Sequence, residues 1–338
     1  MKIALSVSPN GFNERWLDYC KKNNIDCKLV DPCSTSIISD LKDCDVFLWH
    51  WHHADYRHQR FARQLIASLS HTKIKVFPNI DTCWHFDDKI GQKYLLEALG
   101  LDLVPTYVFY EEKTAADWAK KTSYPKVFKL SGGAGSANVK LVRNQKQCLH
   151  LIHKMFHGGF PAFSRWNSFL ERTRKLREHL ISPWTFCKYM KPVILGTRYG
   201  KMTGRIRGYA YFQDFIPDNT HDIRIVVIGK KAFAIRRNCR KNDFRASGSG
   251  EIIYQIDAES ETCAKKAFEM ASVLKMQSCA MDFVFEGNKP LLVEISYGFA
   301  VHGYDRCSGY WDDDMTWHEG SFNPQEWMIE DLIKSLLP

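Results

Sequence analysis

Short apolar segments alternate with amphipathic helical segments over the first eighty residues, and this alternation constrains the fold more than any other feature. Buried strands are predicted at residues 1–7, 26–30, 45–49 and 75–78. Between them, residues 14–22 and 57–69 carry apolar side chains at helical spacing. Strands that alternate with helices form parallel sheets with functional loops at the carboxyl ends of the strands. We therefore expect a parallel α/β domain over residues 1–85.

Beyond residue 85 the pattern changes, because some neighbouring strands, such as 223–227 and 231–237, follow one another without a helix between them. Helices are predicted at residues 88–100, at 114–121 with Thr114 as the cap, at 259–274 and at 325–336. Strands are predicted at residues 105–109, 125–130, 139–142, 205–215, 223–227, 231–237, 280–285 and 290–295. Residues 150–204 are predicted to form a helical insertion with a basic, aromatic surface. We expect two further parts of mixed α/β and α+β character, 86–204 and 205–338.

Charge and hydropathy limit the classes of partner. The formal charge is +9, which favours an anionic partner. The basic residues are spread along the chain, so a nucleic-acid arm is disfavoured. No apolar run approaches the ~18–20 residues that span a bilayer, and the N-terminus lacks the layout of a signal peptide. We expect a cytoplasmic protein without a membrane span.

Cysteines and clustered histidines raise the question of a metal site. The eleven cysteines include no Cys-x-x-Cys pair, which favours reduced thiols in the core over zinc at Cys20, Cys27, Cys33 and Cys44. Three histidines lie in the segment Trp49-His50-Trp51-His52-His53. Adjacent side chains on an extended chain point to opposite sides, so a substrate-facing aromatic loop is favoured over a metal site.

A glycine-rich loop joins two predicted strands at residues 131–138. Glycines let backbone N–H groups approach phosphate oxygens closely. Lys129 ends the preceding strand and could reach the same phosphates. The loop does not match a P-loop, since a strand follows it rather than a helix. The alternatives are a flexible turn and a solvated edge lysine.

Two carboxylates, Asp282 and Glu294, lie in apolar strands on either side of the turn at Gly287. Antiparallel pairing would bring them side by side. Burial of either charge is costly alone, whereas a divalent ion between them removes the cost. The alternative is a solvent-exposed face of the hairpin.

Arginines gather near the same predicted strands, at positions 224, 236, 237, 240 and 245. Arginine binds phosphate or carboxylate with two parallel hydrogen bonds, although most arginines only solubilise a surface. Asp222 and Arg224 lie on one face of their strand.

Taken in order, these features resemble the ATP-grasp superfamily, and most closely the ribosomal-protein glutamate ligases and related carboxylate–amine ligases. The resemblance covers residues 87–298. It rests on Asp88-Lys89-Ile90 with the segment 99–106, on Val127-Phe128-Lys129 with the glycine-rich loop, on Phe212–Pro217 with Asp222-Ile223-Arg224, and on Arg236-Arg237, Asn242–Arg245, Asp282 and Glu294.

The resemblance implies an ATP-grasp fold with an N-terminal Rossmann-like domain, and ATP with Mg²⁺, or Mn²⁺ in its place, as cofactors. ATP would be held by Lys89, Lys129, Gly132, Gly133, Gly135, Ser136, Gln213, Asp214, Phe215, Ile216 and Asp222. The metal would be held by Asp282, Glu294 and Ser296. The catalytic residues would be Arg224, Arg237 and Arg245, which would steady an acyl-phosphate that an amine then attacks.

Two departures from the family pattern concern the metal strand and the nearby loop. Ser296 stands where the family has asparagine, and so does Ser247; Tyr310–His318 is also unusual. The implied activity is an ADP-forming carboxylate–amine ligase acting on an anionic small molecule, peptide or glycan. A small-molecule kinase and an inactive nucleotide-binding scaffold are the alternatives. Homodimer formation is left open.

Overall fold

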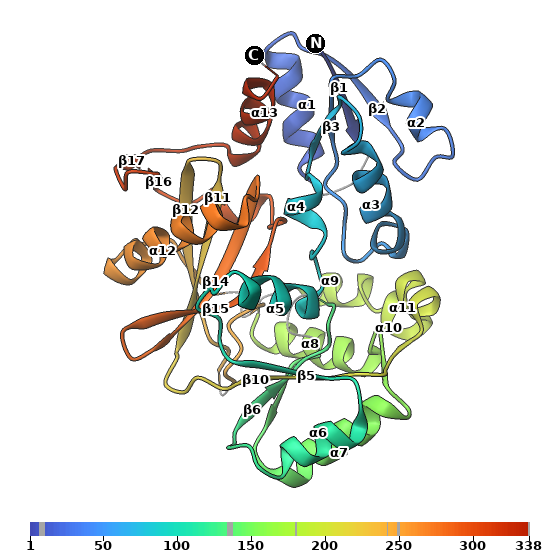
Figure 1. Cartoon of the computed structure of the whole chain (residues 1–338), viewed down its shortest axis with the longest axis vertical. Helices are drawn as coiled ribbons and strands as arrows, with labels where there is room; N and C mark the ends of the chain where they lie inside the picture. Colours follow the sequence, from blue (N-terminus) through green and yellow to red (C-terminus); the bar gives the residue numbers. More distant parts are fainter. Residues whose placement is uncertain (7–10, 134–137, 180, 242, 249–250, 337–338) are drawn as a thin grey trace.

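The computed structural model describes residues 1–6, 11–133, 138–179, 181–241, 243–248 and 251–336. Three sheets and their helices make up most of the chain (Figure 1). Within the described residues, no helix combines the length and the apolar character that crossing a membrane requires.

The first sheet, called the parallel sheet, has the strand order β2-β1-β3-β4 with every pair parallel. Its strands are β1 (Lys2–Ser6), β2 (Asp26–Val30), β3 (Val46–Leu48) and β4 (Lys75–Phe77). Its helices are α1 (Asn13–Lys22), α2 (Ile37–Asp40), α3 (Tyr56–Leu69) and α4 (Ile80–Cys83). The predicted parallel α/β unit is confirmed, while the short helices α2 and α4 were not predicted.

The second sheet, called the small sheet, is antiparallel with the order β5-β10-β6-β7. It contains β5 (Thr106–Phe109), β6 (Lys126–Phe128), β7 (Lys140–Val142) and β10 (Ala210–Asp214), with α6 (Glu112–Ala119) and α7 (Gln145–Phe156) packed against it. The two strands on either side of the glycine-rich segment occur as predicted, and residues 134–137 of that segment lie outside the described residues. The cap predicted at Thr114 is wrong, because α6 begins two residues earlier, after Glu111.

The third sheet, called the large sheet, is antiparallel with the order β15-β14-β11-β12-β16-β17. Its strands are β11 (His221–Ile228), β12 (Lys231–Asn238), β14 (Ser278–Glu286), β15 (Lys289–Ser296), β16 (Gly309–Asp312) and β17 (Trp317–Glu319), and β13 (Ile252–Ile253) pairs with β12. α12 (Ala258–Leu274) packs on it and α5 (Lys89–Ala98) contacts β15. The predicted strands 223–227, 231–237, 280–285 and 290–295 are confirmed, whereas the predicted strand 205–215 is divided into β9 (Arg205–Ile206) and β10 (Ala210–Asp214), which lie outside the large sheet. The unusual segment near residue 310 forms β16 and β17, which were not predicted.

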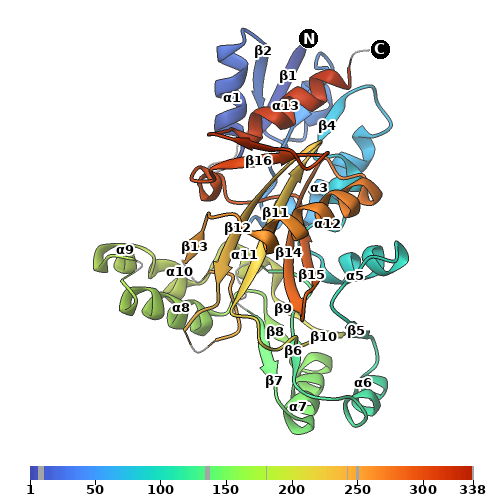
Figure 2. The ribbon, with the colours of Figure 1, turned by 90° about the vertical axis from the view of Figure 1, so that its left-hand side faces the viewer.

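Four short helices form an insertion between the two strands of a small ribbon, β8 (Phe160–Pro161) and β9 (Arg205–Ile206). They are α8 (Arg165–Arg177), α9 (Pro183–Lys188), α10 (Lys191–Leu195) and α11 (Arg198–Thr203). Figure 2 shows α8, α9 and α10 projecting to one side of the molecule. None of the described residues of these helices is buried. A helical insertion was predicted over residues 150–204. Residues 150–156 belong instead to α7, which packs into the core of the small sheet.

Two hydrophobic cores hold the chain together. The larger core combines residues of the parallel sheet with residues of the large sheet and of α13 (Pro324–Lys334). The smaller core lies between the small sheet, α6 and α7. α13 contacts α1 beside the parallel sheet, so the last helix completes the part that the first residues begin (Figure 1).

Candidate functional site

A cavity of about 480 Å³ is lined by residues of all three sheets and of the loops that join them. The parallel sheet contributes the loop after β3, and the small sheet contributes the ends of β6 and β10. The large sheet contributes β11, β14 and β15. Residues that lie far apart in the sequence therefore meet around one space.

Three charged side chains stand in a row across adjacent strands of the large sheet. Arg224 of β11 is the register partner of Asp282 on β14, and Asp282 is the partner of Glu294 on β15. The Arg224 guanidinium donates to both Asp282 oxygens, with Nε–Oδ1 and Nη2–Oδ2 distances of 2.5 and 2.7 Å. The predicted cross-strand pairing of the two carboxylates is confirmed.

A second arginine links Asp282 to Asp222. Arg237 of β12 donates to Asp222 at 2.7 and 2.5 Å, and its Nη2 lies 2.9 Å from an Asp282 oxygen. Burial opposes the charge of Asp282, but Arg224 and Arg237 hold its pKa well below the usual range. Burial raises the pKa of Asp222 despite its bond to Arg237. Asp282 is therefore an ionised carboxylate at neutral pH.

Two buried lysines reach the cavity from different elements. Lys89, the first residue of α5, places Nζ 2.9 Å from Glu294 Oε1. Burial opposes its charged form, but Glu294 and Asp87 raise its pKa overall. Lys129 follows β6, and its Nζ donates to Gln213 Oε1 at 2.5 Å. Desolvation lowers the pKa of Lys129 to about 8.

Asp87 anchors the start of the glycine-rich loop, although no sequence pattern marks it. Its Oδ1 accepts a hydrogen bond from the Gly133 N–H at 2.7 Å, and its Oδ2 accepts one from Gln59 at 3.1 Å. Burial raises the pKa of Asp87 to about 6. A Cβ on Gly132 would lie 3.2 Å from the Asp87 carbonyl oxygen, so this close approach favours glycine.

The segment predicted to hold adenine, Gln213–Ile216, spans the end of β10 and lines the cavity. Asn219 fixes it to β14, because its Oδ1 accepts from Phe285 N at 2.8 Å and its Nδ2 donates to Pro217 O at 2.9 Å. Sequence reasoning missed Asn219, since a single asparagine in a loop carries no periodic signal.

The loop after β12 brings Arg245 to the cavity. Its Nε donates to Asp243 Oδ2 at 2.8 Å, so the guanidinium is paired with a carboxylate of its own loop. Asp243 was not predicted as a site residue. Its position two residues before Arg245 is the sequence feature that could have indicated the pairing.

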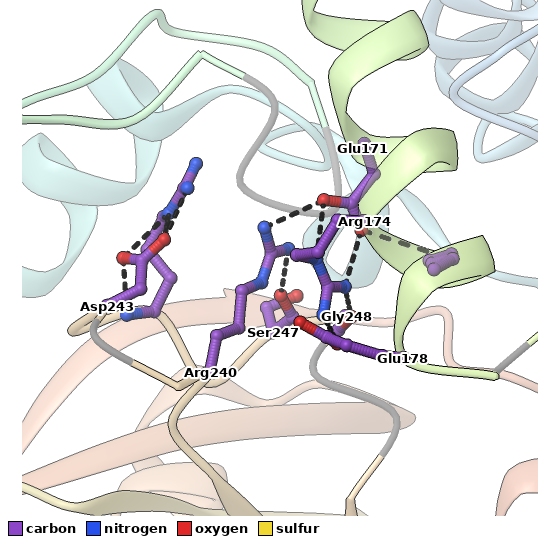
Figure 3. A network of polar contacts seen from close by, with 9 residues as sticks. Glu171, Arg174, Glu178, Arg240, Asp243, Ser247 and Gly248 are labelled. Atoms are coloured by element: carbon purple, nitrogen blue, oxygen red, sulfur yellow. Dashed lines mark hydrogen bonds and ion pairs between the residues drawn. The ribbon is translucent and has the colours of Figure 1, made fainter.

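The same loop is tied to the insertion by a polar network (Figure 3). Arg240 is buried, and its guanidinium donates to Glu171 Oε2 of α8 at 3.0 Å and to Ser247 O at 2.6 Å. Arg174 of α8 donates to Gly248 O at 2.8 Å. Ser247, which departs from the family pattern, thus has its carbonyl held by Arg240.

The Trp49–His53 segment closes the cavity on the side of the parallel sheet. His50, Trp51, His52 and His53 all line it. The His50 ring stacks on Phe12 with a centroid distance of 3.8 Å, and its Nδ1 accepts from Phe12 N at 3.1 Å. Desolvation lowers the pKa of His50 to about 3, so it is neutral at physiological pH. The loop faces the cavity, and its contact with a substrate stays a prediction.

The histidine-rich segment and the N-terminal cysteines can be compared with the geometry of a metal site. Among the described residues, one group alone brings three or more His, Cys, Asp or Glu ligand atoms together, and it contains neither the clustered histidines nor the N-terminal cysteines. All eleven cysteines are free thiols.

Most of the predicted site residues come together at the cavity. Its lining includes Lys89, Lys129, Gly133, Gln213, Asp214, Phe215, Ile216, Asp222, Arg224, Arg245, Asp282, Glu294 and Ser296. Arg237 joins them through its bonds to Asp222 and Asp282, and Gly132 adjoins Asp87. Ser296 Oγ donates to Gly298 O at 2.8 Å and accepts from Gly298 N at 3.2 Å. Gly135 and Ser136 lie outside the described residues. The role of each residue toward a ligand stays a prediction.

Solved structures with the same architecture cover the whole chain. A D-alanine–D-alanine ligase from Bacillus anthracis aligns with a TM-score of 0.59 at 15% identity, covering 100% of this chain and 97% of that one. A RimK domain ATP-grasp protein from Sphaerobacter thermophilus aligns at 0.57 and 15%, covering 99% and 100%. The D-cycloserine synthetase DcsG aligns at 0.57 and 12%, covering 99% of both chains.

The sequence matches no protein-family model and no curated protein. The structural likeness nevertheless defines the class: the chain has the ATP-grasp fold. At these identities the likeness establishes the fold alone.

Proposed function

We propose that the protein is an ATP- and Mg²⁺-dependent ligase that joins a carboxylate to an amine through an acyl-phosphate. The observation that carries this proposal is the meeting of two buried lysines and two carboxylates on one cavity. Lys89 and Lys129 approach it from the helix and strand next to the glycine-rich loop, while Asp282 and Glu294 approach it from the large sheet. Lysines and carboxylates that face one cavity suit a nucleoside triphosphate bound with a metal ion.

The phosphates of ATP would lie against the two lysines. Lys89 is protonated at neutral pH, because Glu294 and Asp87 raise its pKa. Gly133, held by Asp87, starts the loop whose backbone N–H groups would approach the phosphates. Adenine would lie along Gln213–Ile216, where Asn219 holds the segment in place.

The donor set on β14 and β15 fits a magnesium ion. Asp282 and Glu294 are direct cross-strand partners, and Ser296 lies two residues beyond Glu294 on the same face. Carboxylate and hydroxyl oxygens are the hard ligands that Mg²⁺ and Mn²⁺ prefer. When bound, the ion would neutralise charge on the phosphate oxygens during transfer.

Arginines would hold the transferred phosphoryl group. A carboxylate oxygen of the first substrate attacks the γ-phosphorus, the bond to the β–γ bridging oxygen breaks, and ADP leaves. Arg224, Arg237 and Arg245 would bind the acyl-phosphate by exchanging their carboxylate partners for phosphate oxygens. An amine then attacks the carbonyl carbon, inorganic phosphate leaves with its pair of bonding electrons, and the amine nitrogen loses a proton to solvent.

The insertion indicates the chemistry of the second substrate. Residues 162–204 contain nine Lys or Arg against two Glu, a net +7 of the chain's +9. Trp166, Trp184 and Ile194 are exposed there by 67%, 79% and 65%. Exposed rings among cationic side chains suit an anionic peptide or glycan. We propose that such an acceptor binds along the insertion, next to the loop that Glu171 and Arg240 join to the cavity.

The test of the ligase proposal is product analysis. The full chain is incubated with ATP, MgCl₂ and a cell metabolite extract, and ADP release and product masses are followed. Formation of ADP, phosphate and an amide adduct is expected. Glu294→Gln should reduce ADP release on the order of 100-fold, whereas Glu286→Gln, an exposed residue of the same hairpin, should not.

Other outcomes distinguish the alternatives. A phosphate adduct in place of an amide would support the small-molecule kinase. Tight ATP binding without turnover over broad panels of amino acids, peptides and glycans would contradict the ligase proposal. It would support the inactive nucleotide-binding scaffold. A Trp184→Ala, Lys188→Glu variant should raise the KM of the acceptor and leave the KM of ATP unchanged.

A further inference from the structure

Three potential metal ligands meet on the outer surface of the small sheet's helices, away from the cavity. Glu112 lies in the first turn of α6. His153 lies in the last turn of α7, and His157 is its C-cap residue. Residues four apart on a helix share one face, so α7 presents both imidazoles to the start of α6.

The ligand atoms already lie close together. His153 Nδ1 is 3.0 Å from Glu112 Oε1, and His157 Nε2 is 2.9 Å from Glu112 Oε2. The two imidazole centroids are 4.1 Å apart, and the three ligand atoms all lie within 4.8 Å of one another. Zinc bonds of about 2.0–2.2 Å in a tetrahedron place ligand atoms roughly 3.4 Å apart. Small side-chain rotations are therefore enough to direct all three toward one ion.

The backbone positions behind these side chains are fixed by the core of the small sheet. Ala115 and Ala119 of α6 are fully buried against it, as are Cys148 and Met155 of α7. The ligand side chains themselves remain open to solvent, with His153, His157 and Glu112 exposed by 67%, 58% and 37%. A rigid base with accessible ligands allows an ion to enter without unfolding either helix.

We propose that Glu112, His153 and His157 form a second metal site, for a zinc-like divalent transition metal, with water completing the coordination. Two imidazoles and one carboxylate suit Zn²⁺, Co²⁺ and Ni²⁺ better than Mg²⁺, which prefers oxygen ligands. The site therefore differs in metal class from the carboxylate pair on the large sheet. A bound ion would join α6 to α7 and stabilise the unit that carries the glycine-rich loop.

The experiment is a titration of the full, chelator-treated chain with ZnCl₂ by calorimetry and with CoCl₂ by absorption spectroscopy. One equivalent should bind with nitrogen and oxygen ligation, and the melting temperature should rise with the concentration of zinc. His153→Ala, His157→Ala and Glu112→Gln should each weaken that equivalent at least about tenfold. His150→Ala, an exposed histidine of the same helix, is the matched control and should bind like the wild type.

Two results would overturn the proposal. One is a His153→Ala, His157→Ala double variant that binds zinc as tightly as the wild type. The other is a cobalt spectrum with thiolate charge-transfer bands that survive in this double variant, which would assign the uptake to the free cysteines. Because both imidazoles are exposed and Glu112 is only partly buried, the variants should fold, and circular dichroism checks this directly.

Discussion

At the scale of single residues, Asp282 holds a negative charge in a buried position because two guanidinium groups compensate it. Arg224 donates to both of its oxygens, and Arg237 lies within 2.9 Å of one of them. Removing one partner of a buried ion pair leaves the others unpaired in a medium of low polarity, which costs more than the pair itself contributes.

This arrangement predicts the effect of Asp282→Ala on stability. The variant leaves Arg224 and Arg237 without a shared carboxylate, so the free energy of unfolding should fall by about 3 kcal/mol. Urea denaturation followed by circular dichroism measures the change. Glu286→Gln, on the exposed end of the same strand, should change it by less than about 0.5 kcal/mol. Equal stabilities of the two variants would contradict the role assigned to the arginine pair.

A second prediction concerns Lys129, whose pKa is lowered to about 8 by desolvation. The ammonium group that would face ATP becomes neutral as the pH rises above about 8. ATP affinity should then fall by up to about tenfold per pH unit. Isothermal titration with Mg²⁺ and ATP between pH 6.5 and pH 9.5 measures the change. Lys129→Arg keeps its charge over this range and should show a nearly constant affinity.

The sign of the stability effect is opposite to that on binding. The folded pKa of Lys129, about 8, lies below its ordinary value of 10.5, so folding disfavours the ammonium form. Deprotonation relieves this penalty as the pH rises from about 8 to 10.5. In the absence of nucleotide, Lys129 should therefore contribute a gain in stability over this window, which Lys129→Arg should lack.

Residues that break a local pattern could be predicted, and residues that act through a distant partner could not. Asp282 and Glu294 are charges within apolar strands, and Lys129 stands beside a run of glycines. Asp87 gave no such signal, because its importance comes from Gly133, which is far from it in the sequence.

At the scale of elements, the β14–β15 hairpin was the most predictable part of the site. Its apolar alternation and the turn at Gly287 predict two paired strands, and the register joins Asp282 to Glu294. The register shift after Asp282 could not be predicted, since a bulge leaves the alternation on each side intact. The helices α2 and α4 are too short for periodicity to reveal them.

The contact between α8 and the loop after β12 predicts a local change in dynamics. Glu171→Gln removes the charge that Arg240 meets on α8, which should weaken the loop by about 1 kcal/mol. Hydrogen exchange of residues 239–248 should become about fivefold faster. Glu178→Gln, which removes a bond to Arg174 within the insertion, is the control and should have a smaller effect. Equal exchange in the two variants would contradict a coupling through Arg240 (Figure 3).

At the scale of the whole molecule, the two hydrophobic cores divide the chain differently from its sequence order. The larger core unites the beginning and the end of the chain, whereas the smaller core consists of middle segments alone. Local periodicity cannot reveal such a union, because it depends on α13 packing beside α1. The class of fold could be predicted from ordered motifs, but the packing of the last helix beside the first could not.

The division predicts that the two cores unfold separately. Ile152→Ala opens a cavity in the smaller core and should destabilise it by about 2–4 kcal/mol. The buried tryptophans Trp16, Trp49 and Trp51 belong to the larger core, while Trp118 packs against the smaller one. In a Trp118→Phe background, the midpoint of the fluorescence transition should therefore hardly move. Ile225→Ala, a buried residue of the larger core, should lower that midpoint strongly. A common shift in both variants would show that the chain unfolds as one cooperative unit.

The arginines on Asp282 also have a consequence for the order in which ligands enter. A divalent cation that approaches this carboxylate by itself competes with two guanidinium groups already bound there. In the proposed function, nucleotide phosphates would offer those guanidinium groups another anion, and so would free the carboxylate oxygens. Cation and nucleotide should therefore lower each other's dissociation constants by the same factor. Under the proposed function, the ion would then bind tightly only when the nucleotide is also bound, so the empty protein would take up little metal at Asp282.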